Sequence, residues 1–257
     1  MPSVANFATL QDRIRRIERP NALRHGVLPF AVAAIDAALP GGGLALGALH
    51  EILSAGPDEE DAAAATGFAA AIAGRIGAGA VLWVLRRSDL YGPGLAEHGL
   101  DPAWIVRVSA RRDDDILWVL EEGLRSPGIA VVVGEVGRLP MVAGRRLQLA
   151  AERSGVPALV LRRWHTGSEA AAERIRPSAA VTRWRIVSLP SLPGDEPGIG
   201  QPRWRVELLR CRGGEAAAWK VETADASGHV RLSAALADRP AAPRRPAAGS
   251  DEWRRAG

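Results

Sequence analysis

Short, almost uninterrupted apolar runs alternate with helical patterns between residues 27 and 165, and this alternation constrains the fold more than any other feature. We expect strands at 48–53, 81–85, 129–133 and 157–161, and helices at 35–39, 61–76, 114–124 and 142–154. Strands that are apolar on both faces and are separated by helices are typical of a parallel sheet with helices on both sides. The sequence therefore predicts an α/β fold.

The pattern changes after about residue 180, where polar and apolar residues alternate. The runs 181–187 and 202–209 are separated by a connection rich in proline and glycine, and 217–222 adds a third run. Such runs are typical of antiparallel strands with one solvated face. We expect them to extend the same sheet at its C-terminal side rather than to form a separate domain.

Both ends of the chain are expected to lie outside this core, which we place at 27–236. Residues 1–20 predict an amphipathic helix ended by Pro20, which either folds back on the core or binds a partner. Residues 237–257 carry prolines among alanines and arginines, which predicts a disordered basic tail. The candidate partner-binding residues of the two ends are Phe7, Leu10, Ile14, Ile17 and Trp253.

The composition excludes several classes of function. Cys211 is the single cysteine of the 257 residues, so an internal disulfide framework and a cysteine zinc site are excluded. The five histidines lack the spacing of a metal site, and no G-x-S-x-G elbow supports a hydrolase. No charge-free stretch of about 20 residues and no signal segment is found, so we expect no membrane contact and a cytoplasmic location. We expect no metal and no cofactor.

Basic residues outnumber acidic ones only by 33 to 29, but almost every base is arginine, and Lys220 is the single lysine. Arginine suits bidentate phosphate contacts and stacking on bases, so nucleic acid is one interpretation. The alternative is the arginine- and alanine-rich composition of a GC-rich genome.

The segment between residues 27 and 73 contains the turn Gly41-Gly42-Gly43-Leu44, then a strand that ends in His50-Glu51-Ile52, and then Gly56-Pro57. In this order and spacing, these motifs resemble the beginning of the ATPase core of RecA-type recombinases, in which a phosphate loop would begin at Gly56-Pro57. It extends over roughly Leu28 to Glu222 and implies a RecA-like core.

The residues that a phosphate loop needs are missing. Such a loop uses glycines for a tight turn, a lysine on the β- and γ-phosphates and a hydroxyl on magnesium. Gly56 and Pro57 remain, but Asp61 stands where the second glycine belongs, Ala62 where the lysine belongs and Ala63 where the hydroxyl belongs. After the strand 129–133, Gly134 stands in place of the magnesium-binding aspartate, and Glu135 would point to the opposite face if the strand continues.

Four consecutive carboxylates, Asp58, Glu59, Glu60 and Asp61, would also repel a polyphosphate. We expect no ATP hydrolysis and predict that the chain is not an enzyme. We further predict that one or two of these carboxylates cap the following helix in place of a nucleotide.

The sequence combines a compact core without a usable phosphate loop, an amphipathic N-terminal helix at 8–18, and an arginine-rich C-terminus. In these features, and within the RecA-like proteins, the chain resembles the ImuA family. The resemblance implies a part in error-prone translesion synthesis under the DNA-damage (SOS) response. The implied partners are an inactive Y-family-like polymerase homologue of the ImuB type, a DnaE2-type polymerase and a RecA-type recombinase.

The resemblance also implies where DNA would lie, since RecA-type folds hold it against two loops that follow strands of the core. Arginines there would bind the phosphates of single-stranded DNA, and an indole would stack on bases. The alternative is a solvated loop whose Trp164 closes the edge of the core. The candidate DNA-binding residues are Arg138, Arg145, Arg146, Arg162, Arg163, Trp164, Arg174 and Arg176.

The sequence thus predicts a non-catalytic adaptor in damage-induced translesion synthesis. The main alternative is a nucleotide-dependent, DNA-stimulated ATPase related to the recombinases. A third hypothesis is a regulator that blocks recombinase filaments by occupying a subunit site.

Overall fold

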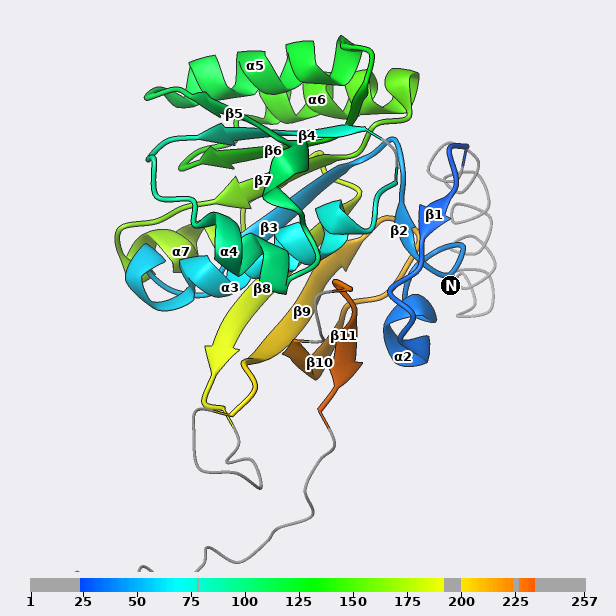
Figure 1. The fold of residues 1–257 in the computed structure, drawn as a ribbon, viewed down its shortest axis with the longest axis vertical. Coiled ribbons are helices and arrows are strands. Elements are labelled where there is room, and N and C mark those ends of the chain that lie inside the picture. Colours follow the sequence, from blue (N-terminus) through cyan, green and yellow to red (C-terminus); the bar gives the residue numbers. More distant parts are fainter. Residues whose placement is uncertain (1–23, 78, 192–199, 224–226, 234–257) are drawn as a thin grey trace, which may run out of the picture.

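The computed structural model describes residues 24–77, 79–191, 200–223 and 227–233, and a nine-stranded sheet forms its centre (Figure 1). Six parallel strands lie in the order β8-β3-β7-β6-β4-β5, and β9, β10 and β11 continue the sheet antiparallel beyond β8. The strands are β3 (Leu49–Ser54), β4 (Ala80–Leu85), β5 (Ile105–Ser109), β6 (Ile129–Val136), β7 (Ala158–Arg162), β8 (Thr182–Leu189), β9 (Arg203–Cys211), β10 (Ala217–Thr223) and β11 (Val230–Leu232). The predicted α/β fold, with antiparallel strands at its C-terminal side, is confirmed.

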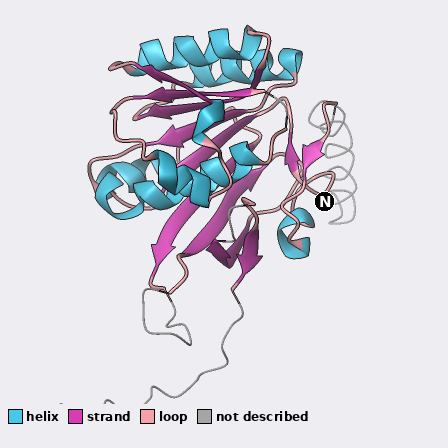
Figure 2. Ribbon diagram, in the orientation of Figure 1, coloured by secondary structure: helices cyan, strands magenta, loops and turns pink. Residues whose placement is uncertain are grey.

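Helices cover both faces of the parallel strands (Figure 2). One face carries α3 (Asp58–Gly74) and α4 (Gly92–Glu97), and the other carries α5 (Asp113–Arg125) and α6 (Met141–Ser154). The helix α7 (Gly167–Arg174) follows β7. The remaining short elements are β1 (Val27–Leu28), α2 (Ala33–Asp36), β2 (Leu44–Ala45) and the 3₁₀ turn η1 (Pro102–Trp104).

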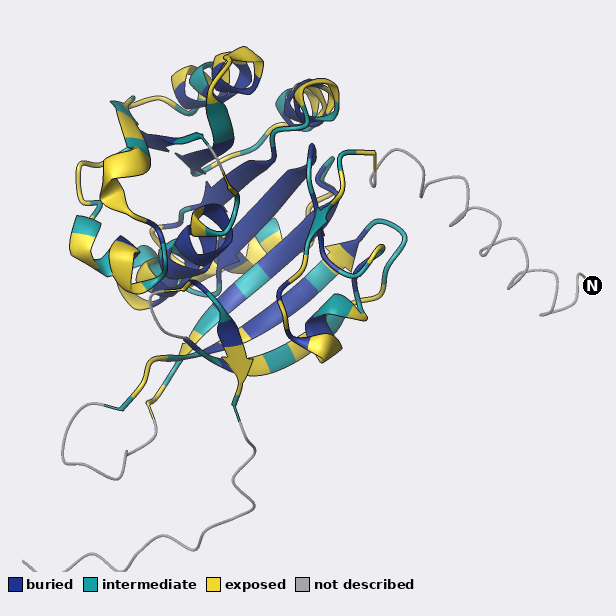
Figure 3. Ribbon diagram, turned by 45° about the vertical axis from the view of Figure 1, so that its right-hand side comes forward, coloured by how far each residue is buried: buried dark blue, intermediate teal, exposed yellow. Residues whose placement is uncertain are grey.

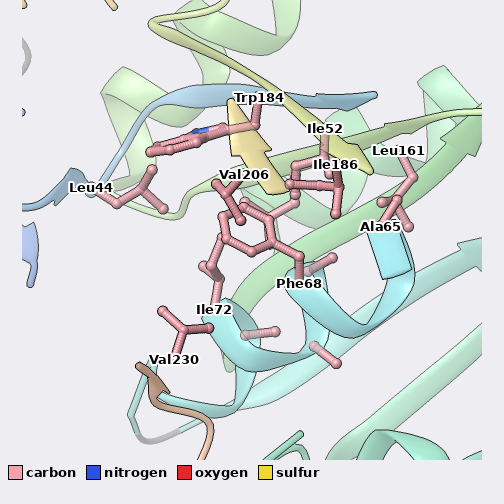
Figure 4. Close-up of a cluster of buried hydrophobic side chains, with 14 of the residues drawn as sticks. Leu44, Ile52, Ala65, Phe68, Ile72, Leu161, Trp184, Ile186, Val206 and Val230 are labelled. Atoms are coloured by element: carbon pink, nitrogen blue, oxygen red, sulfur yellow. The ribbon is translucent and has the colours of Figure 1, made fainter. Parts of the chain in front are cut away.

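The core consists of two apolar layers, one on each face of the sheet (Figure 3). On one face, the alanine-rich α3 lies close against the strands, and its Phe68 packs against Trp184 with ring centroids 5.6 Å apart (Figure 4). On the other face, Ile116 and Leu120 of α5 pack with Val132 of β6. Small residues let α3 lie close to its neighbours: a Cβ at Gly74 would meet the Gly99 carbonyl oxygen at 2.2 Å.

Several boundaries differ from the sequence prediction, and two of them change the site. The helix after Pro57 begins at Asp58 rather than at Asp61, and β6 continues to Val136. The strand β5 was missed because it lies at the edge of the sheet, where Arg107 and Ser109 are exposed and break the apolar run.

The predicted helix 1–20, the predicted tail 237–257 and Trp253 lie outside the described residues. Among the helices that the structure describes, none is long and apolar enough to cross a membrane.

Candidate functional site

The chain passes from β3 into α3 through residues 55–57 alone. The Asp61 amide donates to the Pro57 carbonyl at 3.2 Å, so residues 58–61 already form the first helical turn. The Asp58 amide, at the helix N-terminus, donates to the carbonyl of Trp164 at 3.0 Å. A phosphate loop needs a run of non-helical backbone whose amides point at the ligand. Here helix occupies that place, and Asp61, Ala62 and Ala63 belong to the helix rather than to a loop.

The prediction that the carboxylates cap α3 is wrong. The N-cap residue is Pro57, whose side chain has no acceptor, and the acidic residues begin one position later, inside the helix. Instead, the Asp58 carboxylate accepts from the Trp164 amide at 3.3 Å, and that of Asp61 accepts from the Ser188 amide at 2.7 Å. The two carboxylates therefore fasten the start of α3 to the segment after β7 and to β8.

The remaining glycine of the motif is covered by acidic oxygen atoms. A Cβ on Gly56 would lie 3.0 Å from a carboxylate oxygen of Glu60 and 3.1 Å from one of Asp61. Two negative groups thus lie where the backbone of a working loop would approach a phosphate.

A crevice of about 470 Å³ lies beside α3, between this helix, the segment after β4 and the ends of β6 and β7. Arg163, just past the end of β7, reaches into it. Its guanidinium donates to the Ala62 carbonyl at 3.1 Å, to the Thr66 hydroxyl at 2.8 Å and to Glu135 at 2.8 Å. Because α3 and Glu135 both accept hydrogen bonds from Arg163, its guanidinium is held in place, and the Glu135 carboxylate balances its charge.

Glu135, rather than Gly134, faces the start of α3. A Cβ on Gly134 would lie 2.5 Å from Leu120 of α5, on the opposite face of the sheet. The prediction that Glu135 and Gly134 face opposite sides of the sheet is confirmed. The strand β6 extends through both residues, and neighbouring residues of a strand point to opposite faces. Of these two residues, Glu135 is the one that lines the crevice, and its carboxylate is engaged by Arg163 at 2.8 Å.

Two of the candidate DNA-binding residues are enclosed in the protein. Arg162 is 2% exposed and binds Glu51 at 2.9 Å and Glu173 at 2.8 Å. Trp164 is also 2% exposed; it packs on Leu53, and its indole nitrogen donates to the Ser54 carbonyl at 2.9 Å. Neither side chain can contact DNA, and the alternative, that Trp164 closes the edge of the core, is the one that the structure shows.

The carboxylate of Glu51 joins β3 to β7 and β8 within the protein. Besides Arg162, it pairs with Arg183 at 3.4 Å and accepts the hydroxyl of Ser178. Arg183 also donates to the carbonyls of Glu173 (2.6 Å) and Arg174 (3.1 Å) at the end of α7, and to that of Arg176 (2.7 Å) just beyond it. This network, which we call the Glu51 network (Glu51, Arg162, Glu173, Ser178 and Arg183), holds α7 and the following segment on the sheet.

The remaining candidates lie at the surface, and the structure separates them. Arg138 is exposed after β6, and Arg146 pairs with Glu121. Arg145, Arg174 and Arg176 come together at a groove of about 890 Å³ next to α6, where Arg210 and Arg212 join them. Arg210 and Arg212 were not among the predicted binding residues. Arg210 lies near the end of β9 and Arg212 directly follows that strand, and this position is the signal that could have found them.

Among the described residues, no group of three or more histidine, cysteine, aspartate or glutamate side chains could hold a metal ion.

Fold and site together define a mixed α/β protein in which helix occupies the position where the sequence suggested a phosphate loop. The chain is 43% identical over 223 residues to Protein ImuA from two strains of Caulobacter vibrioides, an alignment that covers 82% of this chain and 91% of each relative. The chain belongs to the ImuA family. No family model matches it.

Proposed function

We propose that the chain is a non-catalytic adaptor in damage-induced, error-prone translesion DNA synthesis. Membership of the ImuA family supports a role in the ImuA/ImuB damage-induced mutagenesis system. The absence of catalysis in this proposal is supported by the start of α3. Helix stands in the expected place of a phosphate loop, carboxylates cover Gly56, and the guanidinium of Arg163 is already bound beside it.

Phosphoryl transfer depends on positioned cations, because charge on the transferred group must be neutralised in the transition state. In the crevice, Arg163 is bound by Glu135, and Arg86 is paired with Asp113 at 2.9 Å. Asp58 and Glu59 line the same crevice. ATP would therefore have to break existing ion pairs and approach uncompensated carboxylates, which argues against the alternative of a DNA-stimulated ATPase.

The proposed partners are an ImuB-type polymerase homologue, a DnaE2-type polymerase and a RecA-type recombinase. Single-stranded DNA is a weaker part of the proposal, since the one predicted stacking side chain, Trp164, is buried. The adaptor role therefore rests mainly on contacts with proteins.

Calorimetry and an ATPase assay test the non-catalytic part. We expect no binding heat with Mg-ATP up to millimolar concentration, and no phosphate release with or without single-stranded DNA. A RecA-type recombinase in the same assays provides the positive control. A saturable heat, or turnover stimulated by DNA, would refute it.

Co-purification tests the adaptor role. A tagged chain, expressed in its own host after DNA damage, is expected to retain the ImuB-type polymerase homologue on the resin. Failure to retain it, with the tagged chain folded and recovered in full, would contradict the proposal.

A further inference from the structure

The groove next to α6 differs from the crevice beside α3 in having open arginines and exposed aliphatic side chains. It lies where the helical layer ends and β8 and β9 continue the sheet, and it is bordered by α6, by residues 174–179 and by the end of β9. The volume of about 890 Å³ is enough for several side chains of a bound segment.

The far wall of the groove is preformed. The segment 175–179, which follows the end of α7, has no regular structure, but arginines of β8, of β9 and of the turn after β9 hold carbonyl oxygens of this region. Arg183 binds those of Arg174 and Arg176, Arg210 binds that of Ser178, and Arg212 binds that of Ala179 at 3.3 Å. A partner would meet a wall that is already ordered, which lowers the entropic cost of binding.

Aliphatic side chains lie exposed along this groove. Ile175 is 83% exposed and Leu149 is 53% exposed, and the partly buried Leu209 of β9 lines the same groove. Exposed aliphatic side chains gathered in one depression are typical of an interaction surface, since burying them is favourable.

The charge of the groove is strongly positive. Its lining contains six arginines and one carboxylate, that of Glu152, which accepts from Gln148 at 2.8 Å. Arg145 and Arg174 make no side-chain hydrogen bond or ion pair within the part of the chain that the structure describes. Their guanidinium groups are therefore available to carboxylates, which they bind bidentately.

We propose that this groove docks an acidic segment of a partner protein that also carries aliphatic side chains. The carboxylates would pair with Arg145 and Arg174, and the aliphatic groups would cover Leu149, Ile175 and Leu209. The proposal rests on the adaptor role proposed above and adds the surface and the chemistry of its partner.

Two observations favour a protein segment over the other occupants. No aromatic side chain lines the groove, whereas proteins that bind single-stranded DNA use aromatic rings to stack on bases. The two ends of this chain outside the described residues are themselves basic: 1–23 has four arginines against two carboxylates, and 234–257 has five against three. Neither end complements the groove in charge.

Fluorescence anisotropy with the full chain tests the proposal. The probe is a fluorescein-labelled twelve-residue peptide with six glutamates and three leucines among serines, compared with a leucine-to-serine peptide and with a labelled twenty-residue oligo-dT. We expect the first peptide to bind with a Kd of about 10 µM or below at physiological salt, and its serine form at least fivefold more weakly.

Matched variants locate the binding. Arg145→Glu/Arg174→Glu is expected to weaken peptide binding at least tenfold, and Arg145→Ala/Arg174→Ala is expected to weaken it less. Arg107→Glu is the control, since Arg107 is an exposed arginine of β5 at the opposite edge of the sheet, and we expect it to change the Kd less than twofold. Circular dichroism checks that each variant is folded.

Three results would overturn the proposal: no binding of the glutamate-leucine peptide, equal binding by the folded Arg145→Glu/Arg174→Glu variant, or tighter, Arg145- and Arg174-dependent binding of oligo-dT. The last would assign the groove to nucleic acid. The anisotropy assay tests peptide binding to the groove and does not depend on the adaptor role. A chain that binds the peptide but retains no polymerase homologue would therefore refute the adaptor role while still supporting the groove as a binding site.

Discussion

The crevice beside α3 and the groove next to α6 are both lined by arginines, but Arg86 and Arg163 of the crevice are paired with carboxylates, whereas Arg145 and Arg174 of the groove have no such pair among the described residues. In the crevice, Arg163 has Glu135, Thr66 and the Ala62 carbonyl as partners. In the groove, Arg145 and Arg174 face solvent without such partners among the described residues. The region that the RecA-type resemblance marks as functional is thus closed by its own side chains, and the region with free binding capacity lies elsewhere.

The comparison shows how the same residue type can serve stability or recognition. A guanidinium inside the protein must be matched by acceptors, because an unpaired buried charge is costly. Once matched, it no longer offers binding energy to a ligand. The Glu51 network connects the two regions, since Arg162 precedes Arg163 in the chain and Arg183 holds the wall of the groove.

The largest effect is expected from Arg162→Met. The substitution leaves Glu51 and Glu173 short of a partner inside the protein, and removing one member of a buried pair costs about 3–5 kcal/mol of unfolding free energy. Urea unfolding measures the loss. Arg146→Met is the control: Arg146 is largely exposed, and its partner Glu121 keeps its pair with Arg125, so we expect a loss of less than about 1 kcal/mol. Similar losses for both would show that the Glu51 network does not hold this region together.

Arg163→Met tests the closed crevice. It leaves the buried Glu135 without its guanidinium, and we expect a loss of about 1–3 kcal/mol of unfolding free energy with no gain of ATP binding. The control is Arg87→Met, an exposed arginine that lines the same crevice. A chain that bound ATP after this substitution would show that Arg163 alone had kept the crevice closed to nucleotide.

A pH effect is expected from His50, which lies on β3, the strand that leads into α3. Burial lowers the pKa of His50 to about 4, although a hydrogen bond to the Ala45 carbonyl opposes this shift. Its other ring nitrogen accepts from the Thr182 hydroxyl, which in turn accepts from the Trp184 indole, so the neutral form fits the network.

The unfolded chain takes up a proton near pH 6.5 and the folded chain only near pH 4, so acidification favours unfolding between these values. From pH 7 to pH 5 we expect the His50 contribution to lower the unfolding free energy by about 2 kcal/mol. Urea unfolding of His50→Gln, compared at the two pH values, should show a decrease smaller by that amount. An unchanged pH dependence would mean that His50 is not the titrating group.

The smallest effect on stability is expected from Arg145→Glu/Arg174→Glu. Both side chains are exposed, so the unfolding free energy should change by about 0.5 kcal/mol or less for each. Thermal unfolding checks this. A larger loss would mean that the groove arginines are part of the folded core, and the contrast with Arg163 would fail.

The sequence predicted the main strands well because β4, β6 and β7 are almost continuously apolar, a pattern typical of strands buried on both faces. It also identified the missing lysine and hydroxyl of the phosphate loop, which are a matter of residue identity. It missed β5, where an exposed edge interrupts the apolar run, and it placed the start of α3 three residues late.

The sequence pattern did not predict which arginines are buried and which are exposed. Arg162, Arg163 and Trp164 follow one another at the end of a strand and look alike as solvent-facing candidates. Their roles depend on partners far along the chain, since Glu51 lies 111 residues from Arg162 and Ser54 lies 110 residues from Trp164.

The amino-acid sequence by itself determined the fold class and the loss of the phosphate-loop chemistry, because apolar periodicity and residue identity are local properties. Only the tertiary structure decided which arginines are buried with carboxylates and which remain open, because burial and pairing depend on which distant strands lie side by side. In this protein, the burial and pairing of the arginines distinguish the closed crevice beside α3 from the open groove next to α6.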